Sequence, residues 1–423
     1  MSLERSLQER MLQDRLSHQS GRLSVGMVID DREEYAAWDG ERGGSVDGVT
    51  EELRVPVACI AKAFTAALLV RELECHGIAL SSNVASLLAL EPGIESDTLA
   101  RISVRQLLDH THGLDGSRLT TVPRLPGGRI DSRALCQELA SSQAIHEPGA
   151  WYSYGNIGPW LAAAILEYIS DRTYEELLAE QILDKIGVPR TGDASKPAPV
   201  CPATGGELSL TARHFLAFMK AHFTARCAAD PSRGSAHRLD VMPGMHVTMP
   251  GWCLERGASV GWKYFGAGWY GYDGVTRTAS SRIRLRFDER IGIAVLAEGK
   301  GAGIALTRLF GRTYPELCPA SLPIDLGSND RPGASVARAC EGEYGNRARS
   351  VRICVGEGSS LRLTSREIGQ PGGEAVEATL MPYRGRQYIL RSKGTRLSSI
   401  VEFVGNAECV THLWDGSQLL RRL

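Results

Sequence analysis

The stretch RVPVACIAKAFTAALLV, residues 54–70, constrains the fold more than any other part of the sequence. From Cys59 to Leu73 the residues leave no clear polar face, and a helix that is apolar nearly all round is a buried helix. Pro56, just upstream, suits the start of a helix. The sequence therefore predicts a buried helix over residues 59–75.

Lys62 interrupts this apolar run. Burial strongly disfavours the charged form of an amine that has no partner. Residues at i and i+3 share one helical face, so the Cys59 thiol and the Lys62 amine should lie side by side. An isolated lysine more often extends its ammonium to solvent from a helix end. The alternative is a nucleophile beside its base.

Length and composition limit the classes of protein. A chain of 423 residues exceeds one small core, so two domains are expected. A hydrophobic content of 43% and a net charge of -1 are those of an ordinary globular protein and give no electrostatic case for nucleic acid or anionic membrane partners. The cysteines form no CxxC pair or Cys/His cluster, so neither a metal site nor a cofactor is expected; they are Cys59, Cys75, Cys136, Cys201, Cys227, Cys253, Cys318, Cys340, Cys354 and Cys409.

Three features favour a cytoplasmic location. The N-terminal stretch MSLERSLQERMLQDRL is charged and amphipathic and lacks the apolar segment of a signal peptide. No apolar run is long enough to span a bilayer. Scattered cysteines fit a reducing compartment.

Hydrophobic periodicity predicts an α+β fold, an antiparallel sheet flanked by helices. Helical patterning covers 2–18, 59–75, 102–114, 159–186, 211–223 and 302–311, and β patterning covers 23–29, 261–270 and 279–297, the last with a turn at 288–290. A Pro/Gly/Ser-rich segment predicts a linker at 321–335 between domains 1–320 and 336–423. The second domain is all-β, a small barrel or sandwich, with strands at 350–356, 360–366, 376–381, 387–392, 399–404 and 409–414.

Four further stretches carry a family resemblance: ISVRQLLDHTHGL (102–114), PGAWYSYGN (148–156), ATGGELSLTARHFLAFM (203–219) and GWYGYDGVTRTASSRIRL (268–285). Together with CIAKAFTAALL they resemble the serine β-lactamase/penicillin-binding-protein superfamily, above all its branch of class C β-lactamases, esterases and D-peptidases. The resemblance covers roughly residues 20–315 and implies one cleft between a helical region and a sheet.

The resemblance assigns a candidate site. The S-x-x-K motif falls on Cys59 to Lys62, the Y-x-N motif on Tyr154-Gly155-Asn156, and the K-T-G or H-x-G motif on Tyr272-Asp273-Gly274. A rival position for the third motif is Ala267-Gly268-Trp269. Two departures stand out, because the nucleophilic serine is Cys59 and the third motif has a tyrosine where the family has a cation or histidine.

The chemistry of these groups can be argued directly. A nearby ammonium and a helix N-terminus favour a thiolate, and Lys62 is either the neutral base or a charged partner of Cys59 or Tyr154. Tyr154 would shuttle a proton, and Asn156 could hydrogen-bond both Lys62 and a substrate amide. The resemblance implies an oxyanion hole made by the backbone N–H groups of Cys59 and Val275.

Each of these residues also has a purely structural interpretation. Tyr154, beside Trp151 and Tyr152, could be a packing aromatic, and Asn156 could cap a helix. His110 and His112 form an H-x-H pair without a third ligand, so we interpret them as structural residues of a turn.

The departures bear on the substrate. Tyr272 offers no positive charge to a carboxylate, although Arg277 could substitute, so β-lactamase and carboxypeptidase activities are disfavoured. A thiolate is expelled again from an amide adduct but exchanges readily with thioesters and esters. The acyl-enzyme that results favours capture by an amine where water is excluded.

The C-terminal segment CEGEYGNR, residues 340–347, resembles the opening strand of the lipocalin-like barrel that several family members carry. This plan resembles the penicillin-binding-protein-type thioesterases of nonribosomal peptide pathways, which implies a carrier-bound peptidyl or acyl thioester released by cyclisation. Two alternatives stay open: a hydrolase (an esterase or D-stereospecific amidase) with the same site, and a catalytically lapsed homologue that binds peptide or protein.

Overall fold

The structure is a computed structural model that describes part of the chain. The described residues are 21–39, 44–45, 53–88, 99–117, 119, 121–140, 144–188, 202–205, 208–227, 247–248, 257–299, 302, 306, 331–368, 375–392, 399–406 and 409–423. The predicted helix at 2–18 lies outside them, as does the predicted helix at 302–311 apart from two residues. Most of the predicted linker also lies outside them, and its last two residues, Ala334 and Ser335, begin helix α11 (Ala334–Cys340).

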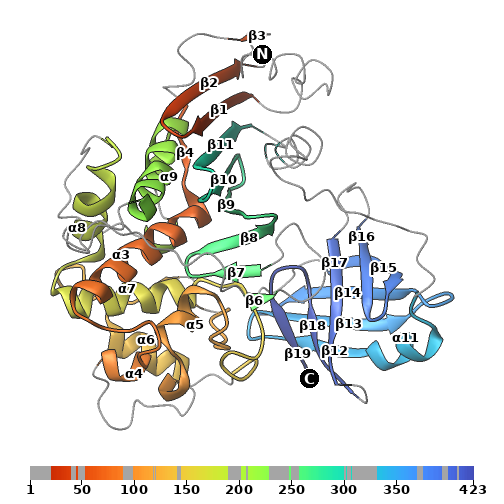
Figure 1. The fold of residues 1–423 in the computed structure, drawn as a ribbon. Helices are drawn as coiled ribbons and strands as arrows, with labels where there is room; N and C mark the ends of the chain where they lie inside the picture. The colour runs from red at the N-terminus through yellow and green to blue at the C-terminus, as the bar shows by residue number, and fades with distance from the viewer. Residues whose placement is uncertain are drawn as a thin grey trace.

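Nine strands of the described chain form one antiparallel sheet, in the order β3-β2-β1-β11-β10-β9-β8-β7-β6 (Figure 1). The N-terminal hairpin pairs with strands from much later in the chain, because β1 lies between β2 and β11. The bounds are β1 Arg22–Ile29, β2 Arg32–Asp39, β3 Gly44–Ser45, β6 Val247–Thr248, β7 Gly257–Ser259, β8 Trp262–Gly266, β9 Trp269–Val275, β10 Ala279–Arg286 and β11 Ile291–Glu298. The segment predicted as one strand at 261–270 is a hairpin, because Ala267 and Gly268 take positive φ values and turn the chain.

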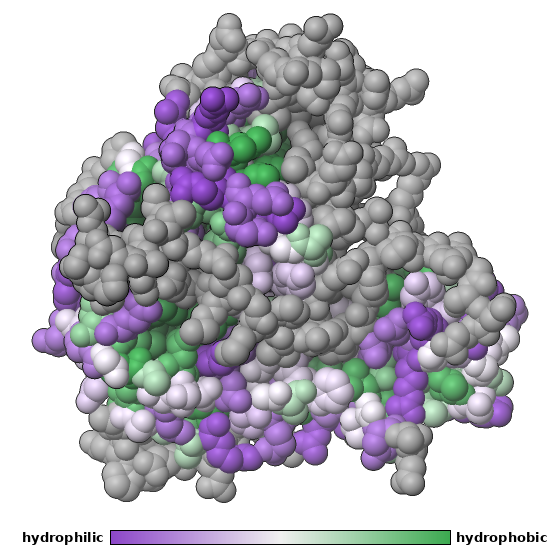
Figure 2. Space-filling model, viewed as in Figure 1, coloured by the Kyte–Doolittle hydropathy of each residue, from purple (hydrophilic) through white to green (hydrophobic). Residues whose placement is uncertain are grey.

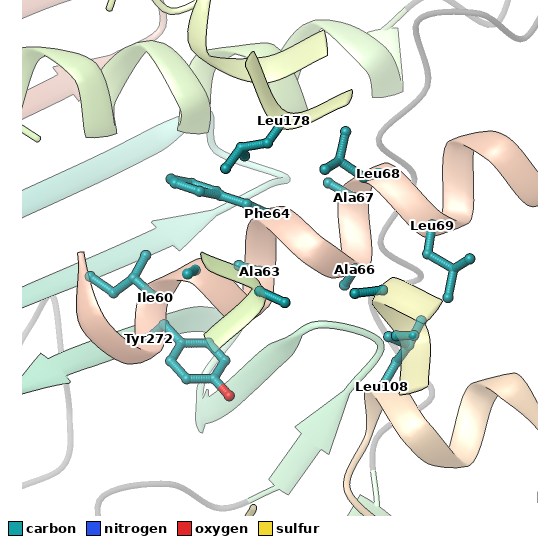
Figure 3. Packing of buried hydrophobic residues seen from close by; sticks show 14 of the residues in the cluster. Ile60, Ala63, Phe64, Ala66, Ala67, Leu68, Leu69, Leu108, Leu178 and Tyr272 are labelled. Carbon is teal, nitrogen blue, oxygen red and sulfur yellow. The ribbon is translucent and has the colours of Figure 1, made fainter. Parts of the chain in front are cut away.

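Helix α3 (Ala61–Cys75) lies between the sheet and helix α7 (Ile157–Ser170) (Figure 1). Every residue from Ala61 to Val70 is buried, Lys62 included, and the labelled side chains in Figure 3 leave the helix in several directions. A buried leucine or phenylalanine contributes about 1.5–3 kcal/mol of hydrophobic stabilisation, so this helix anchors the core. The predicted buried helix is thereby found, although it starts two residues later, after a short 3-10 turn η2 (Ala58–Ile60).

The remaining helices surround α3 or cover the sheet. Helix α9 packs on β1 and β11, while α5 and α3 both pack on α7. The helical pattern at 159–186 is divided, because Asp171 takes a left-handed conformation and Thr173 and Glu176 form a capping box that starts a new helix. The bounds are α4 Val84–Leu87, α5 Val104–Leu108, α6 Ser132–Ala140, α7 Ile157–Ser170, α8 Tyr174–Leu178, η4 Ala179–Leu183 and α9 Ala212–Cys227, with short elements η3 Leu99–Arg101, η5 Pro202–Thr204, β4 Val55–Pro56 and β5 Ser209–Leu210.

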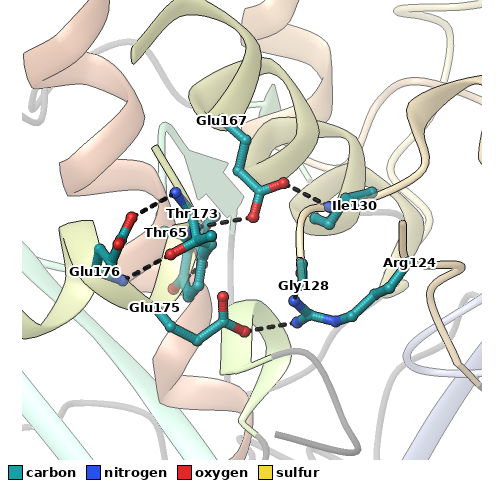
Figure 4. A network of polar contacts seen from close by, with 9 residues as sticks. Thr65, Arg124, Gly128, Ile130, Glu167, Thr173, Glu175 and Glu176 are labelled. Atoms are coloured by element: carbon teal, nitrogen blue, oxygen red, sulfur yellow. Dashed lines mark hydrogen bonds and ion pairs between the residues drawn. The ribbon is translucent and has the colours of Figure 1, made fainter. Parts of the chain in front are cut away.

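A polar network ties three of these helices together (Figure 4). The buried carboxylate of Glu167 on α7 accepts hydrogen bonds from the backbone N–H groups of Ile130, at 2.6 Å, and Tyr174, at 2.8 Å. The Tyr174 hydroxyl lies 2.9 Å from Thr65 Oγ1 on α3. Glu167 is thus occupied in joining α7 to its neighbours.

The C-terminal domain is a closed antiparallel barrel of eight strands, β12 to β19, so the choice between barrel and sandwich is settled. All six predicted strands are present, and Gly342–Gly345 and Leu419–Arg422 close the circle. Buried side chains that include Tyr344, Tyr388 and Phe403 form its core, as expected for so few strands. The bounds are β12 Gly342–Gly345, β13 Arg349–Val355, β14 Leu361–Glu367, β15 Val376–Arg384, β16 Gln387–Ser392, β17 Ser399–Gly405, β18 Val410–Trp414 and β19 Leu419–Arg422.

On the coloured part of the face in Figure 2, apolar residues form small patches among hydrophilic ones. A search of the described helices finds none with the length and hydropathy needed to cross a bilayer.

Candidate active site

Cys59 lies in the turn η2 at the start of the buried helix, and its neighbourhood is conformationally constrained. Ala58 has φ +47°, a left-handed conformation that is costly for a residue with a Cβ atom and that often marks functional sites. The end of strand β9 packs against this turn. A Cβ atom added to Gly274 would lie 2.6 Å from the carbonyl oxygen of Val57, so only glycine allows this close approach.

Lys62 and Tyr154 both reach the region of the Cys59 thiol. Lys62 is 3% exposed, and its Nζ lies 4.9 Å from the centroid of the Tyr154 ring. The Tyr154 ring is half-buried, but its hydroxyl is fully buried. Neither Nζ of Lys62 nor the Tyr154 hydroxyl makes a hydrogen bond of good geometry to any described residue, yet each lies close enough to the thiol to interact with it electrostatically.

The burial of these two groups fixes their protonation. Burial lowers the pKa of Lys62; the neighbouring Cys59 opposes this change and Lys263 adds to it. Burial also raises the pKa of Tyr154 well above its ordinary value, with smaller contributions from Tyr272 and Cys59. The lysine is therefore the group that can lose its proton, and the tyrosine the group that keeps it.

His110 and Tyr272 form the wall next to Tyr154. His110 has φ +60°, and its Nε2 lies 3.3 Å from the Tyr272 hydroxyl. The His110 and Tyr154 rings are 4.8 Å apart between centroids. Burial, followed by the nearby Lys62, holds the pKa of His110 well below its usual range, so this imidazole is neutral.

The H-x-H pair does not form a metal site in the described part of the chain, where no group of three His, Cys, Asp or Glu side chains could hold a metal ion. His112 Nδ1 accepts a hydrogen bond from the backbone N–H of Leu114, at 3.1 Å. Burial lowers the pKa of His112 to about 3. His112 is thus a neutral residue that supports the turn.

The third motif lies at the site, but its two side chains point in different directions. Tyr272 faces His110, whereas Asp273 pairs with Arg284 at 2.6 Å and with Arg282 at 3.6 Å. Burial alone would raise the pKa of Asp273, but the two guanidinium groups lower it to about 2. The Asp273 carboxylate is thus engaged by two arginines, and the role of Asp273 in substrate binding stays a prediction.

The rival position for this motif lies elsewhere. Ala267 and Gly268 form the turn between β8 and β9, at the opposite end of β9 from the residues that pack on η2. Val275, the proposed oxyanion-hole partner of Cys59, is the last residue of β9 and is 59% exposed. Arg277 is exposed in the turn that follows.

Asn156 departs from its expected contact. It precedes α7 as an exposed residue whose side chain does not cap the helix. The hydrogen bond that we expected from Asn156 to Lys62 is not made, because Lys62 Nζ makes no hydrogen bond of good geometry within the described chain and interacts instead with the Cys59 thiol. The Asn156 side chain instead lines the pocket beside Cys59.

The barrel forms one side of this pocket, which has a volume of about 280 Å³ and is lined by Cys59, Tyr154 and Asn156 together with Asn346 and Gln418 of the barrel. The barrel also holds the segment before α7 that carries Tyr154. The backbone N–H of Tyr154 donates to the carbonyl of Ser417 at 3.0 Å, and the N–H of Leu419 donates to Ser153 Oγ at 3.1 Å. Sequence reasoning left the role of this domain open and missed both contacts.

Lys263 is the second residue that sequence reasoning missed. It lies on β8, and its Nζ is 4.9 Å from the Tyr154 ring centroid and 5.5 Å from that of Tyr272. A cation is therefore present near the third motif, contrary to what Tyr272 alone suggested. The sequence did contain a signal for it. The third motif has a tyrosine where the family has a cation, and Lys263 is the one lysine between Lys220 and Lys300 in the sequence.

Comparisons with known proteins agree with this architecture. The family model named Beta-lactamase matches residues 9–308. The crystal structure of SurE with D-Leu has a TM-score of 0.72 at 21% identity and covers 99% of this chain and 98% of that one. At such identity the likeness concerns the fold.

Two curated relatives match at the level of sequence. The putative fimbrial assembly protein FimD, serogroup D, of Dichelobacter nodosus is 28% identical over 164 residues, which are 38% of this chain and only 40% of FimD. Penicillin-binding protein 4 of Amycolatopsis lactamdurans is 22% identical over 360 residues, with 75% of this chain and 91% of that protein covered. Fold and site define a protein of the β-lactamase/penicillin-binding-protein superfamily. The chain belongs to the β-lactamase family.

Proposed function

We propose that this protein is an acyl-transfer enzyme in which Cys59 is the nucleophile. The observation that supports this most strongly is that the buried Lys62 amine and the buried Tyr154 phenol both lie near the Cys59 thiol, at a pocket that Cys59 and Tyr154 line. Buried polar atoms without a hydrogen-bond partner are costly and therefore call for a functional reason. A nucleophile that is flanked by a base and an acid supplies that reason.

The directions of the pKa changes assign the roles. Lys62, whose pKa is lowered by burial, takes the thiol proton. Tyr154, whose pKa is raised by burial, stays protonated and donates to the leaving group.

The reaction balances as two acyl transfers. In the first, Cys59 Sγ forms a bond to the acyl carbon, the bond from that carbon to the donor sulfur or oxygen breaks, and Tyr154 protonates the leaving group. In the second, an amine nitrogen attacks the thioester, the carbon–sulfur bond breaks, and the amine proton returns to the enzyme. The backbone N–H groups of Cys59 and Val275 would stabilise the oxyanion in both steps.

The thiol points to activated acyl donors and to an amine acceptor. A thiolate exchanges with a thioester at little energetic cost, whereas it is a better leaving group than an amide nitrogen. The donor is then a peptidyl or acyl thioester or ester, bound to a carrier protein, and the acceptor is the N-terminus of the same chain, which gives macrocyclisation. SurE, which shares the fold, was solved with D-Leu, and this supports a substrate that includes a D-configured residue.

We place this reaction in the cytoplasm, where the scattered cysteines of the chain would stay reduced. Neither nucleic acid nor membrane is a partner in this proposal, and no cofactor takes part.

Hydrolysis is the second candidate. Cys59 is only partly buried, so water can reach the acyl-enzyme from the side on which an amine would approach. The same residues would then act as an esterase or a D-stereospecific amidase, and the products would differ from a cyclic peptide by one water.

Intact-protein mass spectrometry tests the proposal. A peptidyl or aminoacyl thioester is expected to leave an adduct that maps to Cys59, with none on Cys59→Ala. The exposed Cys75 serves as an internal reference for unspecific acylation. If a series of thioesters and esters leaves no adduct on Cys59, the binding-only alternative is favoured and the enzymatic proposal is wrong.

A further inference from the structure

A second lysine shares the Tyr154 ring with Lys62. Nζ of Lys62 and Nζ of Lys263 each lie 4.9 Å from the centroid of the same Tyr154 ring. Lys263 comes from β8, where it pairs with Ala258 of β7 in register. Ala258 in turn packs against Tyr152 and Tyr154, so this face of the β7–β8 hairpin is turned toward the phenol.

Two aromatic rings hold the Lys263 ammonium in place. Besides Tyr154, the ring of Tyr272 lies 5.5 Å from its Nζ. The faces of tyrosine rings attract cations, and ring centroids within about 6 Å give a favourable interaction. A lysine in this position acts electrostatically on Lys62 and is not among the residues that line the pocket beside Cys59.

We propose that Lys263 is a positioning residue that keeps Lys62 in its uncharged, proton-accepting form. Two ammonium groups on one ring repel each other, and Lys62 is the more deeply buried of the two, so Lys62 releases its proton first. Lys263 thereby takes over, from the neighbouring strand, the positive charge that Tyr272 does not provide. This role rests on the proposed function, in which Lys62 is the base.

The other groups that face Lys62 do not compete for this role. They are the Cys59 thiol from η2, the His110 imidazole from the turn after α5, and the hydroxyls of Tyr154 and Tyr272. Burial keeps His110 neutral, because its pKa is well below the usual range. Burial also raises the pKa values of Tyr154 and Tyr272 well above 10.0, so both stay protonated.

Alkylation of Cys59 by iodoacetamide across a pH series tests the inference without any acyl substrate. In Lys263→Met the second positive charge is lost, so the coupled pair of Cys59 and Lys62 gives up its first proton at higher pH, and the rise of alkylation with pH moves upward. On the acid side of the profile the reaction should slow by about three- to tenfold. Peptide-resolved mass spectrometry follows Cys59, and the exposed Cys75 gives the reference rate in the same sample.

Three variants make the result specific. Lys263→Arg keeps the charge and should restore the wild-type profile, whereas Lys263→Gln should behave as Lys263→Met and replaces it if the methionine variant does not fold. Lys220→Met removes a lysine of α9 that pairs with Glu33 at 2.7 Å and should leave the profile unchanged. A wild-type profile in both neutral variants would overturn the inference. The proposed acyl transfer would be untouched by that result, because its test is the adduct on Cys59.

Discussion

Two buried ionisable side chains lie on the packed helices α3 and α7, and their surroundings are opposite. The carboxylate of Glu167 accepts two backbone hydrogen bonds, and its region is a closed polar network. The Lys62 amine has no hydrogen-bond partner of good geometry in the described chain. A buried group that is satisfied stabilises the fold, whereas one that is left unsatisfied lowers stability and is kept for another purpose. The contrast separates a structural charge from a candidate catalytic one.

Lys62→Met should have the largest effect on the rate of adduct formation, and it tests this contrast directly. Without the base, formation of the acyl adduct on Cys59 should slow by about 10²–10⁴-fold. The same change should raise stability by about 1–3 kcal/mol, because an apolar side chain of similar length replaces a buried amine. Adduct formation and thermal unfolding are measured on the same preparation, with Lys220→Met as the matched control.

The gain in stability should depend on pH with a definite sign. The pKa of Lys62 is lowered from 10.5 in the folded protein, so between the two values the unfolded chain binds the extra proton. Stability of the wild-type protein therefore rises with pH across that window. The methionine variant lacks this rise, so the two stability curves should converge at alkaline pH. A gap that widens toward alkaline pH would contradict the assignment.

Glu167→Ala tests the other side of the comparison. Loss of the carboxylate leaves the backbone N–H groups of Ile130 and Tyr174 buried without an acceptor, which should cost about 2–4 kcal/mol of stability. The adduct rate of the molecules that remain folded should stay at the wild-type level. Urea unfolding gives the first quantity and mass spectrometry at low temperature the second.

Glu167→Gln is the control for that variant. The amide keeps one acceptor oxygen and the shape of the side chain, so its loss of stability should be clearly smaller. If instead Glu167→Ala abolished the adduct while the protein stayed folded, the division between structural and catalytic charges would be wrong.

The sequence was sufficient for the elements and insufficient for their long-range contacts. An apolar run around Lys62 predicts a buried helix, and the S-x-x-K spacing places Cys59 beside the amine, because both are local properties of the chain. By contrast, Tyr154 and Ser417 are bonded across more than half of the sequence, and no local pattern records such a pair. The same holds for Lys263, which reaches Tyr154 only because the sheet brings β8 to the cleft.

Side-chain direction was the other limit. Alternation along β9 could have indicated that Tyr272 and Asp273 face opposite sides of the sheet. It could not have indicated that Arg284 pairs with Asp273. The expected bond from Asn156 to Lys62 failed for a similar reason, because a motif fixes the order of residues and leaves the rotamer to the surrounding packing.

Asp415→Ala should have the smallest effect on the adduct rate. Like Glu167, Asp415 accepts backbone hydrogen bonds, but it lies close to the cleft. Oδ1 of Asp415 accepts hydrogen bonds from the backbone N–H groups of Ser417, at 3.0 Å, and Gln418, at 2.7 Å. These bonds shape the loop in which the Ser417 carbonyl accepts a hydrogen bond from the Tyr154 N–H. Loss of this carboxylate loosens the loop without touching Cys59. Since small displacements of a proton donor are costly, the adduct rate should fall by about three- to tenfold.

Measuring the free energy of unfolding distinguishes this positioning effect from a loss of folded protein. The global cost of Asp415→Ala should be about 1 kcal/mol, as for other part-exposed hydrogen bonds. Glu343→Ala is the matched control, since it removes an exposed barrel carboxylate that pairs with Arg352 and leaves the 415–418 loop intact. If both variants lower the adduct rate equally, the barrel acts only through overall stability. If Asp415→Ala alone does so, the loop of the second domain sets the position of the phenol, and the acid of the site depends on a domain that contributes no catalytic side chain.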